Sequence, residues 1–257
     1  MAKTRTDPDD IEGVTDGRMS LVEHLTELRD RLIKCVVAVA IGMLLGWILY
    51  PWIFETLLDP YCSTLADDVP CRLQQIEPLE GFSVRLKLAG YSGIAFAMPV
   101  ILWQIWRFVT PGLHPHEKKY AVPFVLSALV LFVLGAGLAY WTLPKAFEFL
   151  VQVGGGDLEQ AFRPGAYFQL VTYMMLAFGI GFEFPILLIF LQLVGVVTPA
   201  LLRKWRRYAI VGITVLVAVI TPSGDPYSMI VLSVPMILFY EVSILIGVLI
   251  TRNRAKK

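Results

Sequence analysis

Long runs of apolar residues, separated by short clusters of charged residues, make up most of this chain. A membrane core about 30 Å thick is crossed by roughly 20 apolar residues in helical conformation. Six stretches that are almost free of charge reach or approach that length. They predict six membrane-spanning helices, at about 33–54, 86–108, 120–144, 165–195, 207–221 and 226–250. The fifth is short, which suits a helix with little tilt or a locally thin bilayer.

Prolines fall inside several of the expected spans, at Pro99, Pro123, Pro185 and Pro235. Proline removes one backbone hydrogen bond from a helix, and membrane helices tolerate it as a kink. We therefore expect several kinked helices. The stretch 165–195 is expected to be one long helix that ends near Gly195, with a turn at Thr198 and Pro199.

The domain organisation follows from the same pattern. Residues 20–257 are expected to form a single all-α membrane domain without an internal repeat. Residues 1–19 are polar and rich in acids, and they lack the apolar core of a secretory signal peptide. That composition is typical of a disordered tail.

Lysine and arginine gather near one set of span ends, and the opposite loops are richer in acids. The basic residues on the first side are Arg18, Arg29, Arg31, Lys34, Arg107, Lys118, Lys119, Arg203, Lys204, Arg206, Arg207, Arg252, Arg254, Lys256 and Lys257. Because cytoplasmic loops carry the excess of Lys and Arg, this asymmetry predicts that both termini are cytoplasmic.

Composition supports the membrane class and excludes others. The chain is 56% hydrophobic and 17% charged, whereas soluble domains are about 45–50% apolar and about 25% charged. A formal net charge of +1 argues against nucleic-acid binding by bulk electrostatics. No nucleotide-binding G-x-x-x-x-G-K-[ST] motif occurs.

Two of the three cysteines fall in the first loop on the side opposite the termini. Cys62 and Cys71 flank a turn-like segment, in a compartment that permits disulfides. A disulfide between them is expected, with two free thiols as the alternative. Cys35 is expected to be a packing residue. No metal site is expected, because the three histidines lie on the other side.

A short amphipathic helix precedes the first span. Ser20 followed by Glu23 forms a capping box, which marks a helix start. Glu27 and Arg31 are spaced i,i+4 and can pair. The helix either lies at the membrane interface with solvated charges, or it presents Glu27 to a cationic partner.

Two further acids and one cap stand out. Glu117 is the only acid in the loop between the second and third spans, where it either pairs locally with Lys118 or Lys119 or binds a partner. Glu183 lies inside the fourth span, where an ionisable residue costs about 2.5–3.5 kcal/mol on insertion scales. It is either a structural hydrogen-bonded residue or a functional one. Asp225 precedes Pro226 and is expected to cap the last helix.

Taken together, these stretches resemble the TatC family of the twin-arginine (Sec-independent) protein translocase. The resemblance is carried by His24-Leu-Thr-Glu-Leu-Arg29, Ile76-Glu-Pro-Leu-Glu-Gly-Phe82, the segment Pro99 to Pro111, the loop ending His116-Glu-Lys-Lys119, Phe178 to Pro185, and Thr221-Pro222 with Asp225. The order of these motifs along most of the chain makes the combination specific.

The resemblance implies a function and a set of site residues. The family recognises signal peptides with two consecutive arginines and exports folded cargo with the proton motive force. By position in the motifs, Glu27 and Glu117 would receive the arginine pair, and the recognition surface would include Gln104, Phe108, Arg29 and Lys118. Glu183 would meet a polar side chain on the single span of a TatA- or TatB-type subunit. Pro60, Pro185 and Asp225 are assigned structural roles.

The implied partners are signal peptides, the single-span subunits, membrane lipid and further copies of the chain, with no cofactor. The implied location is the cell membrane. One alternative is a small-molecule or ion transporter that uses Glu183 as a midplane site, but broken helix pairs and further midplane polar groups are lacking. Another is a membrane enzyme, but His24, His114 and His116 have no adjacent nucleophile.

Overall fold

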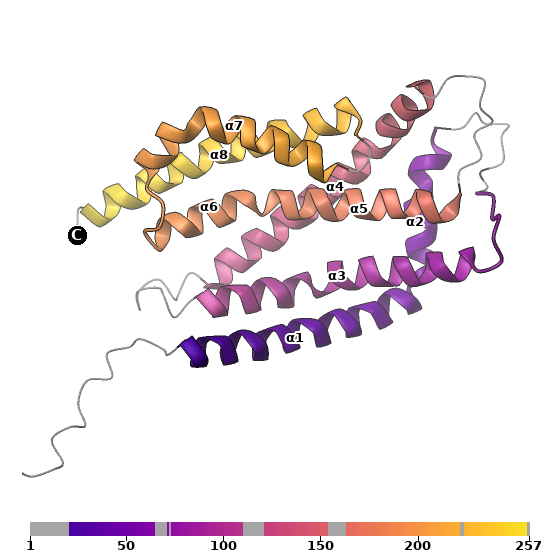
Figure 1. Ribbon diagram of the computed structural model, residues 1–257, viewed down its shortest axis with the longest axis horizontal. Helices are drawn as coiled ribbons and strands as arrows, with labels where there is room; N and C mark the ends of the chain where they lie inside the picture. The colour runs from indigo at the N-terminus through magenta and orange to yellow at the C-terminus, as the bar shows by residue number, and fades with distance from the viewer. Residues whose placement is uncertain are drawn as a thin grey trace, which may run out of the picture.

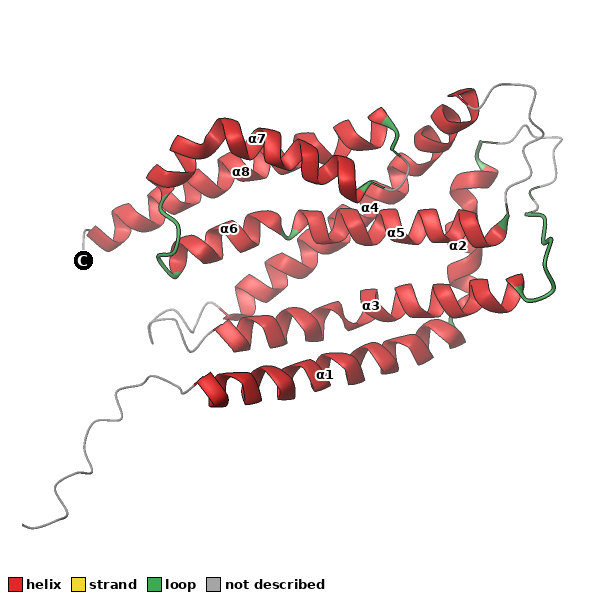
Figure 2. Cartoon of the chain, in the orientation of Figure 1, coloured by secondary structure: helices red, strands yellow, loops and turns green. Residues whose placement is uncertain are grey.

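The computed structural model describes residues 21–64, 71, 73–109, 121–153, 163–221 and 224–255. Within these ranges the regular structure is entirely helical, as Figure 2 shows. The helices are α1 (Leu21–Ile48), α2 (Tyr50–Cys62), α3 (Glu80–Val109), α4 (Ala121–Val153), α5 (Pro164–Phe182), α6 (Phe184–Leu193), α7 (Pro199–Ile220) and α8 (Pro226–Ala255).

Among the described residues, five segments are long and apolar enough to cross a membrane: α1, α3, α4, α5 with α6, and α8. Their axes run broadly along one direction, with α4 crossing the others obliquely (Figure 1). The expectation of an all-α, multi-span membrane protein is therefore confirmed. The expected fifth span, 207–221, covers the later part of α7, whose earlier part carries Arg203, Lys204 and Arg206.

The first span begins and ends earlier than the sequence pattern suggested. The expected segment 33–54 is not one helix, because α1 ends at Ile48 and α2 begins at Tyr50. Pro51 lies at the start of α2, where it has no N–H to continue the hydrogen bonding of α1. The two helices therefore diverge, and α2 passes across α3 in Figure 1.

The fourth span, expected as one long helix over 165–195 with Pro185 inside it, is interrupted at Glu183. The helix α5 ends at Phe182 and α6 begins at Phe184. Pro185 in the first turn of α6 has no N–H, and the Glu183 N–H bonds to Ile180 O at 3.0 Å in a tighter turn. The expected stop is found, since Gly195 has a left-handed φ of 82°.

Other helices extend beyond the expected spans. The helix α3 begins at Glu80, α4 continues to Val153, and α7 begins at Pro199. Charged side chains near a helix end reach the polar interface while the backbone stays helical. Charge therefore marks where the apolar stretch ends, which is not where the helix ends.

Small residues bring α1 and α3 close together in an antiparallel arrangement. Gly42 and Gly46 form a G-x-x-x-G pair on α1 and face α3. A Cβ atom on Gly42 would lie 2.5 Å from the carbonyl oxygen of Gly93, and one on Gly93 would lie 2.7 Å from Met43 N. This close approach fixes how the two helices are aligned along their length.

Two tyrosines, one buried and one half-buried, fasten α2 to the bundle. Tyr167 of α5 is 2% exposed, and its hydroxyl donates to Leu57 O at 2.7 Å. Tyr140 of α4 donates to Thr56 O at 3.0 Å. Both bonds join a core helix to the backbone of α2, so its position depends on the core.

Cys62 and Cys71 form a disulfide that closes the residues after α2 into a loop. We predict that reducing it, or replacing both residues with serine, lowers the free energy of unfolding by about 2 kcal/mol, because a short closed loop restricts the unfolded chain. Thermal unfolding with and without reductant measures the effect. Cys35→Ser is the matched control, and an equal loss there would contradict the prediction.

Candidate functional site

A polar hollow lies where the first turns of α1 face the last turns of α3. Its volume is about 430 Å³. Its lining consists of Val22, Glu23, Thr26, Glu27, Asp30, Arg31 and Lys34 from α1 and Arg107 from α3. We call it the α1–α3 pocket. Since acids and bases alternate around it, it can bind a charged group by several ion pairs.

Glu27 is the central acid of this pocket. Its Oε1 accepts hydrogen bonds from the guanidinium of Arg31, one turn further along α1. The two side chains are 21% and 13% exposed, so water screens the pair little. The other oxygen, Oε2, is buried and has no hydrogen-bond partner within the described residues. Glu27 thus retains capacity to accept a second donor.

The structure brings two of the other expected recognition residues to the same end of α3. Phe108 stacks on the ring of His24, with centroids 4.5 Å apart, and so holds the start of α1 against α3. Gln104 lies one turn before Phe108, and its Oε1 is buried without a hydrogen-bond partner in the described part of the chain. Both residues lie beside the pocket and neither lines it.

Arg29 does not belong to the pocket. Its guanidinium pairs with the neighbouring Asp30 at 3.0 Å, and both side chains are largely exposed, at 69% and 54%. Such an exposed pair contributes little to stability. Glu117 and Lys118, the remaining expected recognition residues, lie outside the described residues.

Sequence reasoning did not assign Asp30, Lys34 and Arg107 to this site, although all three line the pocket. Helical spacing was the available signal for α1, since Asp30 and Lys34 follow Glu27 by one and two turns. Arg107 is on another helix, and only the antiparallel packing of α1 and α3 places it here. No local pattern could have identified it.

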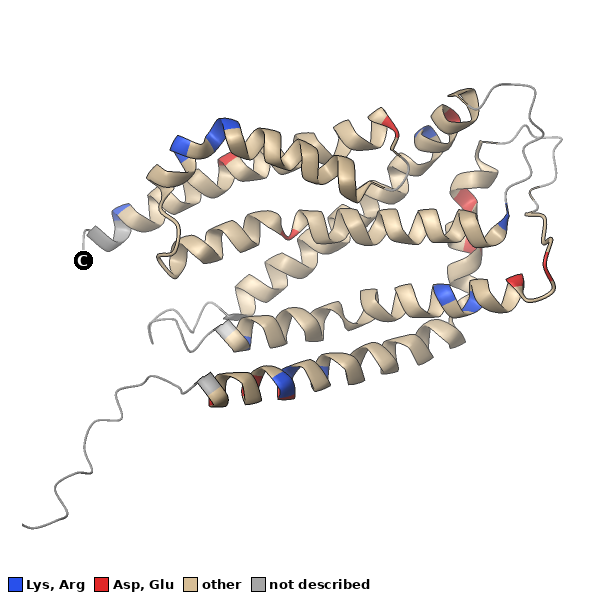
Figure 3. Ribbon diagram, in the orientation of Figure 1, with Lys and Arg blue, Asp and Glu red and all other residues tan. Residues whose placement is uncertain are grey.

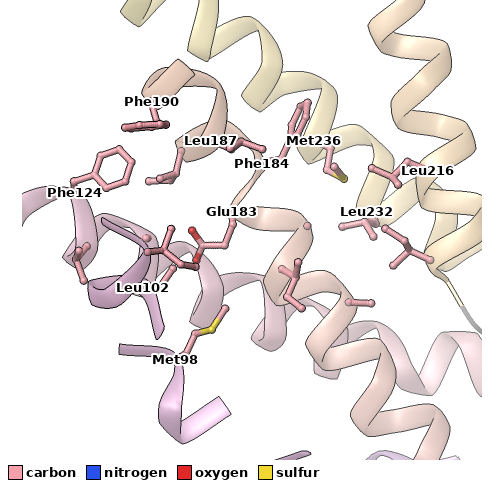
Figure 4. A pocket seen from close by; sticks show the side chains of 18 of the residues that line it. Met98, Leu102, Phe124, Glu183, Phe184, Leu187, Phe190, Leu216, Leu232 and Met236 are labelled. Carbon is pink, nitrogen blue, oxygen red and sulfur yellow. The ribbon is translucent and has the colours of Figure 1, made fainter. Parts of the chain in front are cut away.

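A second hollow, of about 390 Å³, surrounds Glu183 at the break between α5 and α6. Apart from Glu183, the named lining residues are apolar, and they include Met98, Leu102, Phe124, Phe190 and Met236. Figure 4 shows the carboxylate projecting among these side chains. Its Oε1 is buried and has no hydrogen-bond partner among the described residues. A polar group from outside this part of the chain would satisfy it.

The residues given structural roles lie as follows. Asp225 is fully buried and accepts a hydrogen bond from Ser228 N at 2.6 Å, at the start of α8. Pro185 is buried in the first turn of α6, and its carbonyl accepts from Ser243 Oγ at 3.4 Å. Pro60 is buried inside α2. The described residues contain no cluster of three or more His, Cys, Asp or Glu that could hold a metal ion.

Charge is distributed unevenly along the bundle. Figure 3 shows basic residues gathered at the end of the bundle where α1 and α7 begin and α8 ends, whereas the opposite end holds acids together with other basic residues, including those near the start of α3. The α1–α3 pocket belongs to the basic end, since Arg31, Lys34 and Arg107 line it.

Comparison with known proteins agrees with this architecture. Residues 23–235 match the family described as "Sec-independent protein translocase protein (TatC)". A relative with that description from Frankia casuarinae is 40% identical over 253 residues, covering 95% of this chain and 70% of its own. One from Aquifex aeolicus is 38% identical, covering 92% of this chain and 98% of its own.

Solved structures agree as well. A structure described as "Crystal Structure of Twin Arginine Translocase Receptor- TatC" superposes with a TM-score of 0.74 at 38% identity, covering 89% of this chain and all of its own. The resemblance drawn from the sequence motifs is thereby confirmed over most of the chain. The chain belongs to the TatC family of Sec-independent protein translocase proteins.

Proposed function

We propose that this chain is the receptor subunit of a twin-arginine protein translocase and that it binds twin-arginine signal peptides in the α1–α3 pocket. The observation that carries the proposal is Oε2 of Glu27, which is buried in a pocket at the basic end of the bundle and has no hydrogen-bond partner among the described residues. The match to a twin-arginine translocase receptor supports it. The role is one of binding and transport without covalent catalysis.

The chemistry of Glu27 accounts for a preference for arginine over lysine. A guanidinium presents parallel N–H donors that a carboxylate binds bidentately, whereas an ammonium is a point charge. Arg31 already demonstrates that Glu27 accepts two guanidinium N–H groups. Glu117, from the neighbouring loop, is proposed as the second acid, with Gln104, Phe108, Arg29 and Lys118 around it.

The proposed topology has six spans with both termini in the cytoplasm of a cell membrane. The basic residues gathered where α1 and α7 begin and α8 ends support this orientation through the positive-inside rule. The fifth of these spans is the later part of α7, and the sixth is α8. In this orientation the α1–α3 pocket faces the cytoplasm, where a signal peptide arrives with folded cargo, and the disulfide faces outside.

The hollow around Glu183 is proposed as the docking site for the single span of a TatA- or TatB-type subunit. We predict that Glu183→Leu weakens this docking by about 3- to 30-fold, because one hydrogen bond within lipid contributes about 0.6–2 kcal/mol. Glu183→Gln should retain most of it. Crosslinking between cysteines placed on α5 and on the partner span measures docking, and equal crosslinking in Glu183→Leu would refute the assignment.

A transporter function centred on Glu183 has less support. Glu183 is the only ionisable residue among those lining its hollow. A carrier site for ions or polar solutes needs several polar groups near the midplane, together with broken helix pairs in both halves. The single break within the described spans lies at Glu183.

An export assay tests the proposed function. The chain and its single-span partners would be produced in cells that lack their own receptor subunit, with a folded fluorescent reporter behind a twin-arginine signal. We expect export that stops when the arginines become lysines and when an uncoupler removes the proton motive force. Export that persists with a twin-lysine signal, or with the uncoupler, would exclude this function.

A further inference from the structure

Arg85 is a partly buried arginine near the start of α3, whereas the α1–α3 pocket lies at the end of that helix. Its guanidinium carbon lies 4.3 Å from the ring centroid of Trp47 and 5.0 Å from that of Tyr50. One terminal nitrogen donates to Trp47 O at 3.3 Å. The two aromatic rings hold the cation in place through cation–π contacts.

Among the described residues, no carboxylate pairs with this charge. Arg85 takes part in none of the ion pairs among the described residues, and its buried Nε has no hydrogen-bond partner there. The acids that precede it are engaged elsewhere: Glu77 pairs with Arg163 at 2.6 Å, and Glu80 accepts from Gly165 N at 3.2 Å. A partly buried cation without a counter-charge is costly, so an external anion would stabilise it.

An apolar hollow begins one turn further along the same face of α3. Leu88, Ser92 and Ala95, which follow Arg85 by three, seven and ten residues, line it. The other walls come from α2, α4 and α5, and its volume is about 220 Å³. Trp52 of α2 lines it and is 64% exposed, so the hollow borders the surface that faces lipid.

We propose that Arg85 and this hollow bind one anionic phospholipid of the outer leaflet, with its phosphate on the guanidinium and one acyl chain in the hollow. The helical rise places Ser92 about 10 Å deeper than Arg85, which suits a phosphate and the upper acyl chain of the same molecule. Arg85 and the hollow both lie along a segment apolar enough to cross a membrane. A lipid phosphate is therefore the anion available at this depth.

Native mass spectrometry of the purified chain tests this inference. Phosphatidylglycerol and phosphatidylcholine with identical acyl chains would be titrated separately. We expect tighter retention of phosphatidylglycerol, and a loss of about tenfold or more in Arg85→Gln, because a hydrogen bond to a charged group is removed. Ala95→Leu, which fills the hollow, should weaken binding of both lipids.

Lys87→Gln is the matched control, since it removes the same charge from the same helix while Lys87 bonds to Gln169 at 3.0 Å. If only diffuse electrostatic attraction between the cation and the anionic lipid were lost, the affinity for the lipid would fall by at most about fivefold in either variant. Equal losses in Arg85→Gln and Lys87→Gln, or no loss in Ala95→Leu, would overturn the proposal. Glycerophosphoglycerol is the headgroup of the lipid without its acyl chains. If it displaced the lipid at equimolar concentration, the site would bind a soluble phosphate ester and not a phospholipid. If Arg85→Gln does not fold, Arg85→Lys is compared with the same control.

Discussion

Replacing Glu27 with glutamine is expected to weaken binding of a twin-arginine signal peptide by about 30-fold or more. The substitution keeps the size of the side chain and removes the charge that a guanidinium requires. Because Glu27 is only 21% exposed, water cannot replace the lost interaction for a bound arginine. Fluorescence anisotropy of a labelled peptide with the purified chain in nanodiscs measures the change.

Arg31 supplies a control from the same ion pair. It occupies Oε1 of Glu27 in the absence of peptide, so an incoming arginine must share or displace it. Arg31→Gln should therefore bind the peptide at least as tightly as the unmodified chain, whereas Glu27→Gln binds it weakly. Glu55→Gln, at an exposed position of α2, should leave peptide binding unchanged. Equal loss in the Glu27 and Arg31 variants would indicate that both simply disrupt α1.

Replacing Gly93 with valine is expected to lower the free energy of unfolding by about 3 kcal/mol or more. Any Cβ at this position would lie 2.7 Å from Met43 N and 2.9 Å from Met43 Cα, both backbone atoms of α1. A flexible side chain could rotate away, but the backbone of α1 cannot, so the helices must separate. Thermal unfolding in detergent measures the loss.

The same substitution should also weaken the binding of signal peptide, because the α1–α3 pocket takes residues from both helices. Gly90→Val is the matched control, since a Cβ there would meet no atom within 4 Å. If the Gly93 and Gly90 variants unfold at the same temperature, close packing of α1 on α3 is not what holds the pocket together.

The sequence predicted an all-helical protein with several membrane spans, because membrane thickness sets a length that any spanning helix must meet. It did not predict α2, because the apolar run 33–54 continues through Pro51 without a change in composition. It also did not predict the break at Glu183. Hydropathy does not change where a helix bends. The only sign of the turn between α1 and α2, or of that between α5 and α6, is therefore a proline within an apolar run.

The candidate site was predictable only in part. Glu27 and Phe108 follow from motifs that the sequence displays, and the structure places their helix ends together. The pairing of Glu27 with Arg31 follows from i,i+4 spacing. The contribution of Arg107 depends on how α1 and α3 align, which is set by glycines about ten residues or more away from it in the sequence.

The most direct test of the central claim is a double-mutant cycle between the peptide and Glu27. Twin-arginine and twin-lysine forms of one signal peptide would be titrated against the unmodified chain and against Glu27→Gln. The account predicts that the unmodified chain prefers arginine by about tenfold or more, and that most of this preference disappears in Glu27→Gln. An arginine preference of the same size in both proteins would show that Glu27 does not recognise the arginine pair.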